Sequence, residues 1–213
     1  MRKAASHNAI EHPLEEDLWQ SHDLILGMDE AGRGPLCGPL TVAGVIFPKG
    51  YENPLLNDSK KLSEKKREQL ALQIMDDALA YQIVFIDERT IDELNIYQAS
   101  REGMETIADH LQADWILTDA MPLHRHPNHQ AEIKGDARSI SIAAASILAK
   151  TARDRYMMEL DREYPQYGLA RHKGYPTRAH LDAIEEHGVQ EFYRRSYAPV
   201  QRILNRENQE TLF

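Results

Sequence analysis

The most constraining feature of the sequence is a short apolar run that ends in two acidic residues and a glycine-rich stretch. The run 24–28 is followed by Asp29 and Glu30, and then by a segment that contains Gly32, Gly34 and Gly38. A short apolar run closed by turn-forming residues is typical of a buried strand. A strand end holds a side chain at a fixed place while the loop beyond it stays open to substrate. The sequence therefore predicts an acidic site at one edge of a sheet.

Strand-like and helix-like segments alternate along the rest of the chain. We predict further strands at 41–47, 81–86 and 115–118, and helices at 63–79, 91–111, 142–163 and 177–187. The strand at 41–47 should run antiparallel to the first, and the segment 121–130, with its prolines and histidines, should form a loop. The alanine-rich start of the helix at 142–163 predicts close packing on another element. This order predicts a mixed α/β sheet covered by helices.

Length and composition indicate one folded domain outside the membrane. The chain has 213 residues, and none of its apolar runs approaches the ~20 residues that a membrane span needs. The N-terminal stretch is polar and acidic, and the single cysteine, Cys37, fits a reducing compartment. We therefore expect a cytoplasmic monomer with an N-terminal extension at 1–22, a catalytic domain with a C-terminal helical region at 23–200, and a tail at 201–213.

The net charge of −9 is unusual for a protein that binds nucleic acid, but basic residues cluster locally. The segment 171–206 has seven Lys and Arg residues against four Asp and Glu residues, and 59–67 has five against one. Phosphate contacts depend on such local clusters more than on the total charge. Two interpretations remain open, which are basic binding surfaces and ordinary solvated helix faces.

Four acidic residues stand out by their position in the sequence. Asp29 and Glu30 follow the first predicted strand, Asp119 follows the strand at 115–118, and Asp136 precedes the alanine-rich helix. Hard divalent cations take oxygen ligands, and two ions about 3.5–4 Å apart can clamp both the attacking and the leaving oxygen of a phosphodiester. Taken singly, each of these signals is weak, because an Asp-Glu pair at a strand end is more often a cap or a solvated turn. Only their combination indicates a two-metal site.

Five separated motifs resemble, in the same order, those of the bacterial ribonuclease HII family. They lie at 27–39, 57–62, 118–120, 133–150 and 172–175. The resemblance spans about 24–200 and implies a ribonuclease H-like fold, in which a mixed five-stranded sheet is flanked by helices and followed by a small C-terminal helical region. The Gly-Arg-Gly triplet at 32–34 separates the chain from the sister ribonuclease HIII group.

The resemblance implies a metal-dependent endonuclease that hydrolyses the RNA strand of RNA-DNA hybrids. Asp29, Glu30, Asp119 and Asp136 would be both catalytic and metal-binding, and would hold two Mg²⁺ or Mn²⁺ ions. One ion would activate water and the other would stabilise the leaving 3′-oxygen, so no histidine base is required, although His172 could assist product release. The enzyme would also incise on the 5′ side of single ribonucleotides in duplex DNA and leave 5′-phosphate and 3′-hydroxyl ends.

The resemblance also implies how substrate is recognised. The implied substrate-binding residues are Gly32, Arg33, Gly34, Lys60, Lys61 and Tyr175. The triplet would contact the 2′-hydroxyl, which distinguishes RNA from DNA, and Tyr175 would pack on the sugar of the following deoxynucleotide. The two lysines would lie near the nucleic-acid backbone. The alternatives are a packed surface aromatic at Tyr175 and a solvated loop at the two lysines.

Several other residues invite a chemical role that the sequence does not support. Cys37 is predicted to be a small packed residue rather than a nucleophile. Asp154 is expected to pair with its neighbours Arg153 and Arg155. The histidines of the loop at 121–130 lack nearby cysteines, and we expect a solvated loop rather than a zinc site. Ala120 stands where many members of the family have glycine, but the carboxylate before it is retained.

The last five residues, Gln209–Phe213, resemble the short peptide with which bacterial repair proteins bind the sliding clamp. Glu210 departs from the aliphatic residue usual in that peptide. A rival to the nuclease is a catalytically inactive hybrid-binding protein on the same fold, against which the four retained carboxylates argue. A second rival is another nuclease or a recombinase on this fold, which need not carry the glycine-arginine-glycine triplet and Tyr175.

Overall fold

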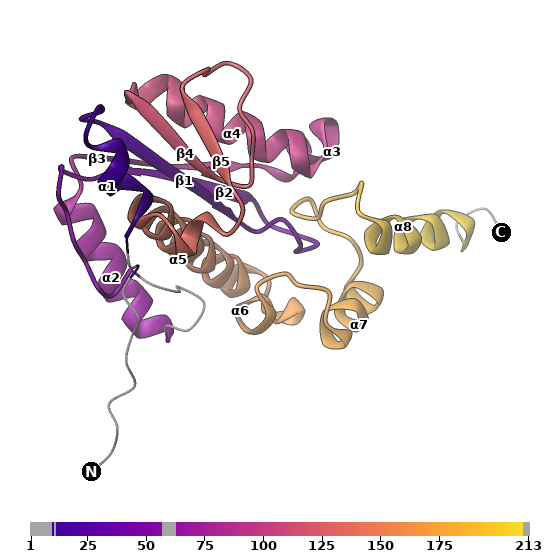
Figure 1. Ribbon diagram of the computed structural model, residues 1–213. Helices are drawn as coiled ribbons and strands as arrows, with labels where there is room; N and C mark the ends of the chain where they lie inside the picture. Colours follow the sequence, from indigo (N-terminus) through magenta and orange to yellow (C-terminus); the bar gives the residue numbers. More distant parts are fainter. Residues whose placement is uncertain (1–9, 11, 57–62, 211–213) are drawn as a thin grey trace, which may run out of the picture.

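The computed structural model describes residues 10, 12–56 and 63–210 (Figure 1). Within these residues, a five-stranded sheet has the order β3-β2-β1-β4-β5. The strands are β1 (Ile25–Ala31), β2 (Leu40–Ile46), β3 (Ala80–Ile86), β4 (Trp115–Asp119) and β5 (His129–Glu132). β2 runs antiparallel to β1 and β3, whereas β4 runs parallel to β1 and β5. The predicted mixed sheet is therefore confirmed.

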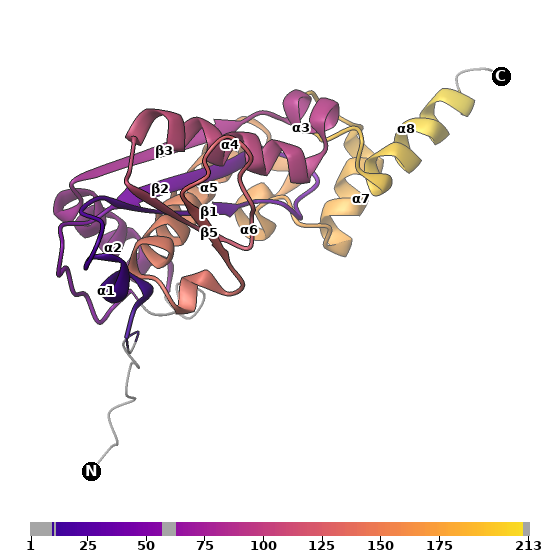
Figure 2. The same ribbon diagram turned by 45° about the horizontal axis from the view of Figure 1, so that its top comes forward.

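Helices cover both faces of this sheet (Figures 1 and 2). The helices of the described residues are α1 (Leu14–Leu18), α2 (Glu64–Asp77), α3 (Glu88–Leu94), α4 (Ile96–Leu111), α5 (Ile140–Glu163), α6 (Leu169–His172), α7 (Arg178–His187) and α8 (Ala198–Glu210), with 3-10 turns η2 (Gly135–Ala137) and η3 (Pro165–Tyr167). Helix α4 packs on one face against Met28 and Val42, and α5 with α2 packs on the other against Ile25 and Ala43. The sheet therefore separates two apolar cores.

Strand β1 is longer than its apolar run predicts. The backbone of Asp29, Glu30 and Ala31 continues the antiparallel pairing with β2, because ladder hydrogen bonds do not depend on side-chain polarity. Successive side chains of a strand point to opposite faces. Asp29 lies near Ser146 on α5, and Glu30 lies near Ser100 on α4. The two acidic residues thus lie inside the strand and face opposite sides of the sheet.

Helix α5 approaches β1 as closely as its alanines predict. A Cβ atom on Gly27 would lie 2.4 Å from the backbone nitrogen of Ile142, so only glycine fits there. Ala144 and Ala145 are fully buried against the sheet. The N-cap of α5 is Ser139, whose hydroxyl accepts a hydrogen bond from the Ile142 N–H at 3.0 Å. The segment that precedes this cap carries Asp136.

Two sequence predictions about the α4 and β5 regions are wrong in detail. The predicted helix at 91–111 is two helices, because Asn95 adopts a φ of 68° and its side chain caps α4 by accepting from the N–H groups of Tyr97 and Gln98. The apolar spacing continues across this break and hides it. The end of the predicted loop at 121–130 belongs to β5, which starts at His129 and has no strand-like apolar alternation.

A third apolar core joins the C-terminal region to the body. Leu36 in the loop after β1 packs with Met157 of α5, Ile184 of α7 and Val200 of α8. In both views α8 projects beyond the rest of the molecule (Figures 1 and 2). Trp19, which follows α1, is buried in the core between the sheet and helices α2 and α5. Among the described residues, no helix combines the length and apolar character needed to cross a bilayer; the domain boundaries at 22 and 200 remain predictions.

Candidate active site

Three of the four predicted carboxylates line one cleft at the end of the central strands. Strands β1 and β4 are parallel, with Met28 opposite Thr118, so their C-terminal ends meet at the same edge of the sheet. Asp29, Glu30 and Asp119 line a cleft with a volume of about 460 Å³. The other lining residues are Ala31, Gly32, Arg33, Gly34, Arg67, Ser146, Lys150, Arg153 and Tyr175. Carboxylates and cations therefore share one cleft.

The carboxylates in this cleft are held close to one another and away from water. Burial raises the pKa of Asp29 well above its usual range, the charges of Glu30 and Asp119 raise it further, and a hydrogen bond from Ser146 opposes them. Burial also raises the pKa of Glu30, against the charge of Arg33, whose Nη1 lies 3.3 Å from Glu30 Oε1. Burial thus disfavours the ionised forms of Asp29 and Glu30, and the charge of Arg33 offsets part of this effect at Glu30.

Asp136 lies on the turn η2 beside the cleft rather than among the residues that line it. The preceding Gly135 N–H donates a hydrogen bond to Asp119 Oδ1 at 2.8 Å, which fixes this turn against the end of β4. Among the described residues, no three Asp, Glu, His or Cys side chains form a closed metal-ligand group. The structure thus gathers three of the predicted carboxylates and places the fourth on the adjoining turn.

The chemistry of these residues fits a divalent cation. Glu30 Oε2 is buried and has no hydrogen-bond donor, which is costly for a carboxylate oxygen. A cation near this oxygen would relieve both that cost and the mutual repulsion that raises the pKa of Asp29. All the available side-chain ligands are oxygens, as Mg²⁺ and Mn²⁺ prefer. Mg²⁺ sites commonly use few carboxylates and complete their shell with water and substrate phosphate oxygens, which suits an open ligand set.

The glycine-arginine-glycine loop forms the wall of the cleft beside these carboxylates. Gly32 has a φ of 100°, and a Cβ atom there would lie 2.1 Å from Arg153 Nε, so a side chain has no room. The carbonyl of Arg33 accepts hydrogen bonds from the Tyr197 hydroxyl at 2.7 Å and from Arg194 Nη1 at 3.2 Å. The backbone of the loop is therefore fixed from behind, while the Arg33 side chain stays exposed.

Tyr175 lies against this loop from the C-terminal region. A Cβ atom on Gly34 would lie 3.3 Å from Tyr175 Cε1, so the absence of a side chain at Gly34 lets the ring pack closely. The carbonyl of Tyr175 is hydrogen-bonded to His180 Nδ1 at 2.9 Å, and His180 is fully buried. Tyr175 itself is nevertheless 44% exposed. The predicted sugar-contacting aromatic is thus held beside the triplet with part of its surface free.

Two buried arginines hold these two loops together, and sequence reasoning assigned them no role in the site. Arg153 donates to the carbonyls of Cys37, Pro39 and Lys173 at 2.9–3.0 Å, and so bridges the loop after β1 and the segment before Tyr175. Arg194 donates twice to the carbonyl of Gly38. Burial, and then the charge of Arg194, lowers the pKa of Arg153 to about 10. Backbone carbonyls, rather than carboxylates, therefore solvate these two guanidinium groups.

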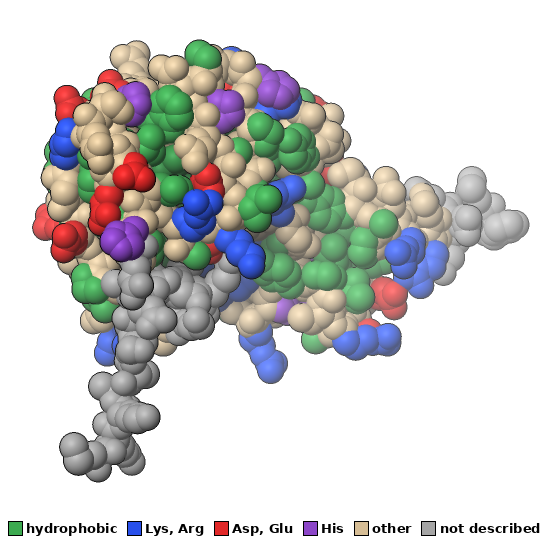
Figure 3. All heavy atoms as spheres, in the orientation of Figure 1, with side chains coloured by type: hydrophobic (Ala, Val, Ile, Leu, Met, Phe, Trp, Pro, Cys, Tyr) green, Lys and Arg blue, Asp and Glu red, His purple; other side chains and the backbone are tan. Residues whose placement is uncertain are grey.

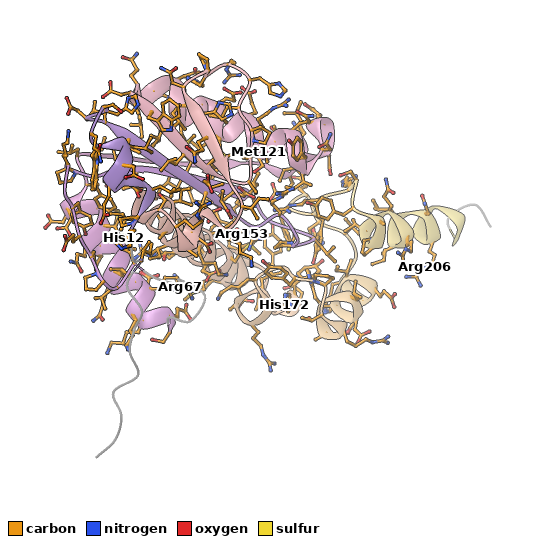
Figure 4. All side chains as sticks on the ribbon, viewed as in Figure 1. His12, Arg67, Met121, Arg153, His172 and Arg206 are labelled. Atoms are coloured by element: carbon orange, nitrogen blue, oxygen red, sulfur yellow. The ribbon has the colours of Figure 1, made fainter. Side chains whose placement is uncertain are left out.

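The predicted pairing of Asp154 with Arg153 and Arg155 is wrong. Asp154 Oδ1 pairs with Lys150 Nζ at 2.6 Å, and its Oδ2 lies 3.8 Å from Arg67 on α2. Arg67 and Lys150 line the cleft, and Figure 4 marks Arg67 and Arg153. Spacing along α5 was an available signal, because Ser146, Lys150 and Asp154 recur every four residues and so lie on one side of the helix.

Basic residues are distributed unevenly over the surface. Figure 3 shows Lys and Arg side chains over the middle and lower right of this face, and Asp and Glu mainly on its left. The cluster at 171–206 is not uniformly available for phosphates, because Arg194 is buried and Arg178 and Arg206 pair with Asp182 and Glu185. The predicted Lys60 and Lys61 lie outside the described residues.

Cys37 and His172 contact other groups of the protein and are not among the residues that line the cleft. Cys37 is fully buried, and burial raises the pKa of its thiol to about 12, which confirms the prediction of a packed residue. His172 bonds to the Tyr167 carbonyl and accepts from the Gly174 N–H, so its part in product release stays a prediction. The loop histidines His124 and His126 contact Arg101 and Asp109.

Carboxylates at the ends of parallel strands, beside a cationic and glycine-rich wall, define the class of nucleases that hydrolyse phosphodiesters with divalent cations. The family model described as ribonuclease HII matches residues 26–200. Ribonuclease HII of Francisella tularensis subsp. mediasiatica is 52% identical over 185 residues, which cover 85% of this chain and 99% of that protein. The chain therefore belongs to the ribonuclease HII family, whose members are metal-dependent, and it is an endonuclease that hydrolyses RNA in RNA-DNA hybrids.

Solved structures agree with this assignment. Ribonuclease H2 from Pyrococcus horikoshii OT3 has a TM-score of 0.77 at 25% identity, with coverage of 87% of this chain and 99% of that chain. Ribonuclease HII from Archaeoglobus fulgidus, solved in a complex with PCNA, has a TM-score of 0.71 at 27% identity, with coverage of 84% and 96%. The ribonuclease H-like fold implied by the five motifs is thus confirmed.

Proposed function

We propose that Asp29, Glu30, Asp119 and Asp136 form the catalytic and metal-binding set, and that the enzyme incises on the 5′ side of single ribonucleotides in duplex DNA as well as in hybrids. The observation that carries this proposal is the shared cleft. Buried carboxylates with raised pKa values lie there beside the Gly-Arg-Gly loop and Tyr175. Carboxylates with shifted pKa values that lie in a cleft favour a catalytic role over passive binding.

Two Mg²⁺ or Mn²⁺ ions bound by these four carboxylates would supply an activated water and stabilise the leaving 3′-oxygen, giving 5′-phosphate and 3′-hydroxyl ends. The protein positions these oxygens. Asp29 and Glu30 are fixed by the sheet ladder, Asp119 ends the neighbouring strand, and Asp136 is tied to Asp119 through Gly135.

The recognition wall, defined as residues 32–34 and Tyr175, would select the sugar. The absence of side chains at Gly32 and Gly34 lets Arg153 and Tyr175 pack against the loop, which fixes its backbone in one arrangement. The peptide groups of this fixed loop would then form hydrogen bonds with a 2′-hydroxyl. The exposed part of the Tyr175 ring would pack on the next sugar, and a hydroxyl there would crowd it. Ribose on one side and deoxyribose on the other would then mark the junction to be cut.

Cations around the cleft would bind the phosphates without reading sequence. Arg33, Arg67 and Lys150 line the cleft, and Asp154 holds the last two in place. The family resemblance adds Lys60 and Lys61, which lie outside the described residues. Phosphate contacts position a duplex but carry no base information, so cleavage should tolerate many sequences.

The test is cleavage of three end-labelled duplexes, which are DNA with one ribonucleotide, DNA alone and a long RNA-DNA hybrid. Each is incubated with Mg²⁺, Mn²⁺ or chelator. We expect metal-dependent incision on the 5′ side of the single ribonucleotide, with the all-DNA duplex intact. Cleavage of the long hybrid alone would remove the proposed roles of the recognition wall. Binding without any cleavage would favour the rival of an inactive hybrid-binding protein.

The C-terminal tail is a second element with a proposed partner. The chain's last five residues resemble a clamp-binding peptide, and a structural neighbour is the ribonuclease HII of Archaeoglobus fulgidus in a complex with PCNA. Gln209 and Glu210 end α8, which projects from the body, and the residues after them lie outside the described part (Figure 1). We infer that this tail of a monomeric enzyme docks on a sliding clamp.

Deletion of Leu212 and Phe213 tests the tail, with the purified clamp as bait. We expect clamp binding to be lost and hybrid cleavage in solution to be retained. Clamp capture that survives the deletion would refute the proposed docking peptide. Light scattering of the enzyme alone should give the mass of one chain, and a dimer mass would refute the monomer.

A further inference from the structure

Glu15 is a buried carboxylate that lies outside the segment matched by the family model. It is fully buried on the short helix α1. Its Oε1 accepts hydrogen bonds from the Ser139 hydroxyl at 2.5 Å and the Ser141 N–H at 2.9 Å, and its Oε2 accepts from the Ile140 N–H at 3.3 Å. A side chain from the start of the chain thus holds the first residues of α5.

These contacts continue into the turn that carries Asp136. The Leu14 N–H donates to the carbonyl of Arg138 at 3.0 Å, so α1 holds this turn by its backbone as well. The Ser139 N–H donates to the Gly135 carbonyl at 2.8 Å, and the Gly135 N–H donates to Asp119 Oδ1 at 2.8 Å. A continuous chain of hydrogen bonds therefore runs from Glu15 to Asp119 and encloses Asp136.

We propose that Glu15 is a positioning residue, which sets the metal affinity of the active site by fixing the turn that bears Asp136; this inference rests on the proposed role of Asp136. The Glu15 carboxylate is not among the groups that line the cleft. It acts through Ser139, whose hydroxyl it holds, and through Ile140 and Ser141, whose N–H groups would be left without a partner in its absence.

The geometry separates this role from ordinary helix capping. Ser139 already caps α5 by accepting from the Ile142 N–H, and the alanines of α5 hold the helix against β1. Helix α5 therefore keeps its own cap and its packing without Glu15. The turn before it has fewer constraints, and it includes Lys134 with a φ of 59°, a conformation that a non-glycine residue rarely adopts without support. Loss of Glu15 should thus loosen the turn more than the helix.

The experiment compares Glu15→Gln with a matched control, Glu16→Gln, on the same helix. Glu15→Gln keeps the side-chain volume but replaces one acceptor oxygen with an amide donor that faces N–H groups. Glu16 is exposed and pairs with the exposed His12, so its change should leave the turn intact. Mn²⁺ binding to the substrate-free enzyme is measured from the electron paramagnetic resonance signal of free Mn²⁺, and Mn²⁺ dependence and KM are measured with a long hybrid.

For Glu15→Gln we expect the dissociation constant for Mn²⁺ to rise about tenfold, as is common when a residue that orients a ligand is lost. The Mn²⁺ concentration at half-maximal cleavage should rise in parallel. The KM for the hybrid at saturating Mn²⁺ should stay unchanged, because neither Glu15 nor Asp136 is among the residues that line the cleft with the recognition wall. Glu16→Gln should match the unmodified enzyme in all three readouts.

Unchanged Mn²⁺ binding in Glu15→Gln, with only a loss of stability, would overturn the inference and leave Glu15 a structural residue. If Glu15→Gln does not fold, Glu15→Asp keeps the charge with a shorter reach and should weaken Mn²⁺ binding to a smaller degree; unaltered binding would again overturn it. Asp136→Asn is measured in parallel. Full turnover in that variant would refute the proposed catalytic set itself, which is a separate failure.

Discussion

Two neighbouring regions of the molecule differ in their electrostatic environment. One is the carboxylate cluster, which is defined as Asp29, Glu30, Asp119 and Asp136. The other is the recognition wall. In the cluster, burial and then neighbouring acidic charge raise the pKa of Asp29, burial raises the pKa of Glu30, and one oxygen of Glu30 has no donor. Behind the wall, two buried arginines donate to backbone carbonyls: Arg194 to those of Arg33 and Gly38, and Arg153 to those of the loop at 37–39. One region contains buried carboxylates whose ionised forms are disfavoured, and the other contains positive charge that is bonded to backbone carbonyls.

This difference indicates a division of labour. An acidic cluster that is poorly satisfied on its own has most to gain from divalent cations and from the substrate phosphates that accompany them. A loop whose carbonyls are tied down presents its N–H groups and small residues in one arrangement, which favours selection by shape. The cluster would therefore set the rate of cleavage, and the wall would set where cleavage occurs. Substitutions in the two regions should differ in what they change.

The largest expected effect is the loss of turnover in Asp136→Asn. Removal of one metal-binding carboxylate should cost several kcal/mol of transition-state stabilisation and lower kcat on the order of 10³-fold. The folded state should persist, because Asp136 is partly exposed on a turn. The measurement is single-turnover cleavage of a long hybrid, with circular dichroism as the check on folding. Turnover equal to that of the unmodified enzyme would remove Asp136 from the cluster.

The next largest effect concerns Arg153, whose side chain bridges the loop after β1 and the segment before Tyr175. Arg153→Met should lower the free energy of unfolding by about 2–3 kcal/mol, because three carbonyls lose a charged donor. Selectivity for a single ribonucleotide over an all-DNA duplex should fall as well. The control is Arg155→Met, which removes an exposed pair with Glu68 and should cost at most about 1 kcal/mol. Equal effects of the two changes in urea denaturation would contradict the bridging role.

Asp29→Asn should stabilise the metal-free protein at neutral pH, by about 0.5–2 kcal/mol, while abolishing most cleavage. Burial and neighbouring charges raise the pKa of Asp29 in the folded state. Its contribution to stability is therefore fully present below the pKa of the unfolded chain and is lost as pH rises through the folded pKa. The gain on substitution should thus grow as pH rises from acid to neutral in urea denaturation with chelator.

Asp114 provides a control of opposite sign for this prediction. Hydrogen bonds from the N–H groups of Leu24 and Asp23 lower its pKa, so its contribution is present above the unfolded pKa and is lost as pH falls. Asp114→Asn should therefore destabilise the protein at neutral pH and have less effect in acid. A loss of stability for both substitutions at neutral pH would show that the ionised Asp29 carboxylate does not destabilise the folded protein.

The smallest effect is expected for Gly34→Ala at the wall. The added methyl group would lie 3.3 Å from the Tyr175 ring, which would have to move by a few tenths of an ångström. Stability should change by less than about 1 kcal/mol, since both residues line an open cleft. The ratio of kcat/KM values for a single ribonucleotide and a long hybrid should fall severalfold. An unchanged ratio would show that Tyr175 does not sense the sugar after the ribonucleotide.

Much of the fold was predictable because its signals are local. Ser63 caps α2, Thr177 caps α7 and Gly188 follows it, as their positions before and after helical patterns predict. The helix break at Asn95 was not predicted, because the apolar spacing continues through it. Strand β5 lies at the edge of the sheet and has polar residues, so its sequence resembles a loop.

The sequence predicted that Asp29, Glu30 and Asp119 come together, but it did not predict the contacts that hold the recognition wall. Acidic residues at the ends of strands leave a pattern in the sequence, and the family motifs named the same positions. The bonds of Arg153 and Arg194 to backbone carbonyls leave no pattern, because a carbonyl occurs at every residue. The partner of Asp154 was missed since Arg67 comes from another helix, although the four-residue spacing to Lys150 was visible.

The central claim, that the wall selects and the cluster cuts, is tested most directly by the binding of Asp136→Asn to two labelled duplexes. Fluorescence anisotropy in Ca²⁺ would compare DNA containing one ribonucleotide with DNA alone. We predict that the variant prefers the ribonucleotide duplex by the same factor as the unmodified enzyme under these conditions, although it does not cut. A preference that disappears with the carboxylate would contradict the separation of the two regions.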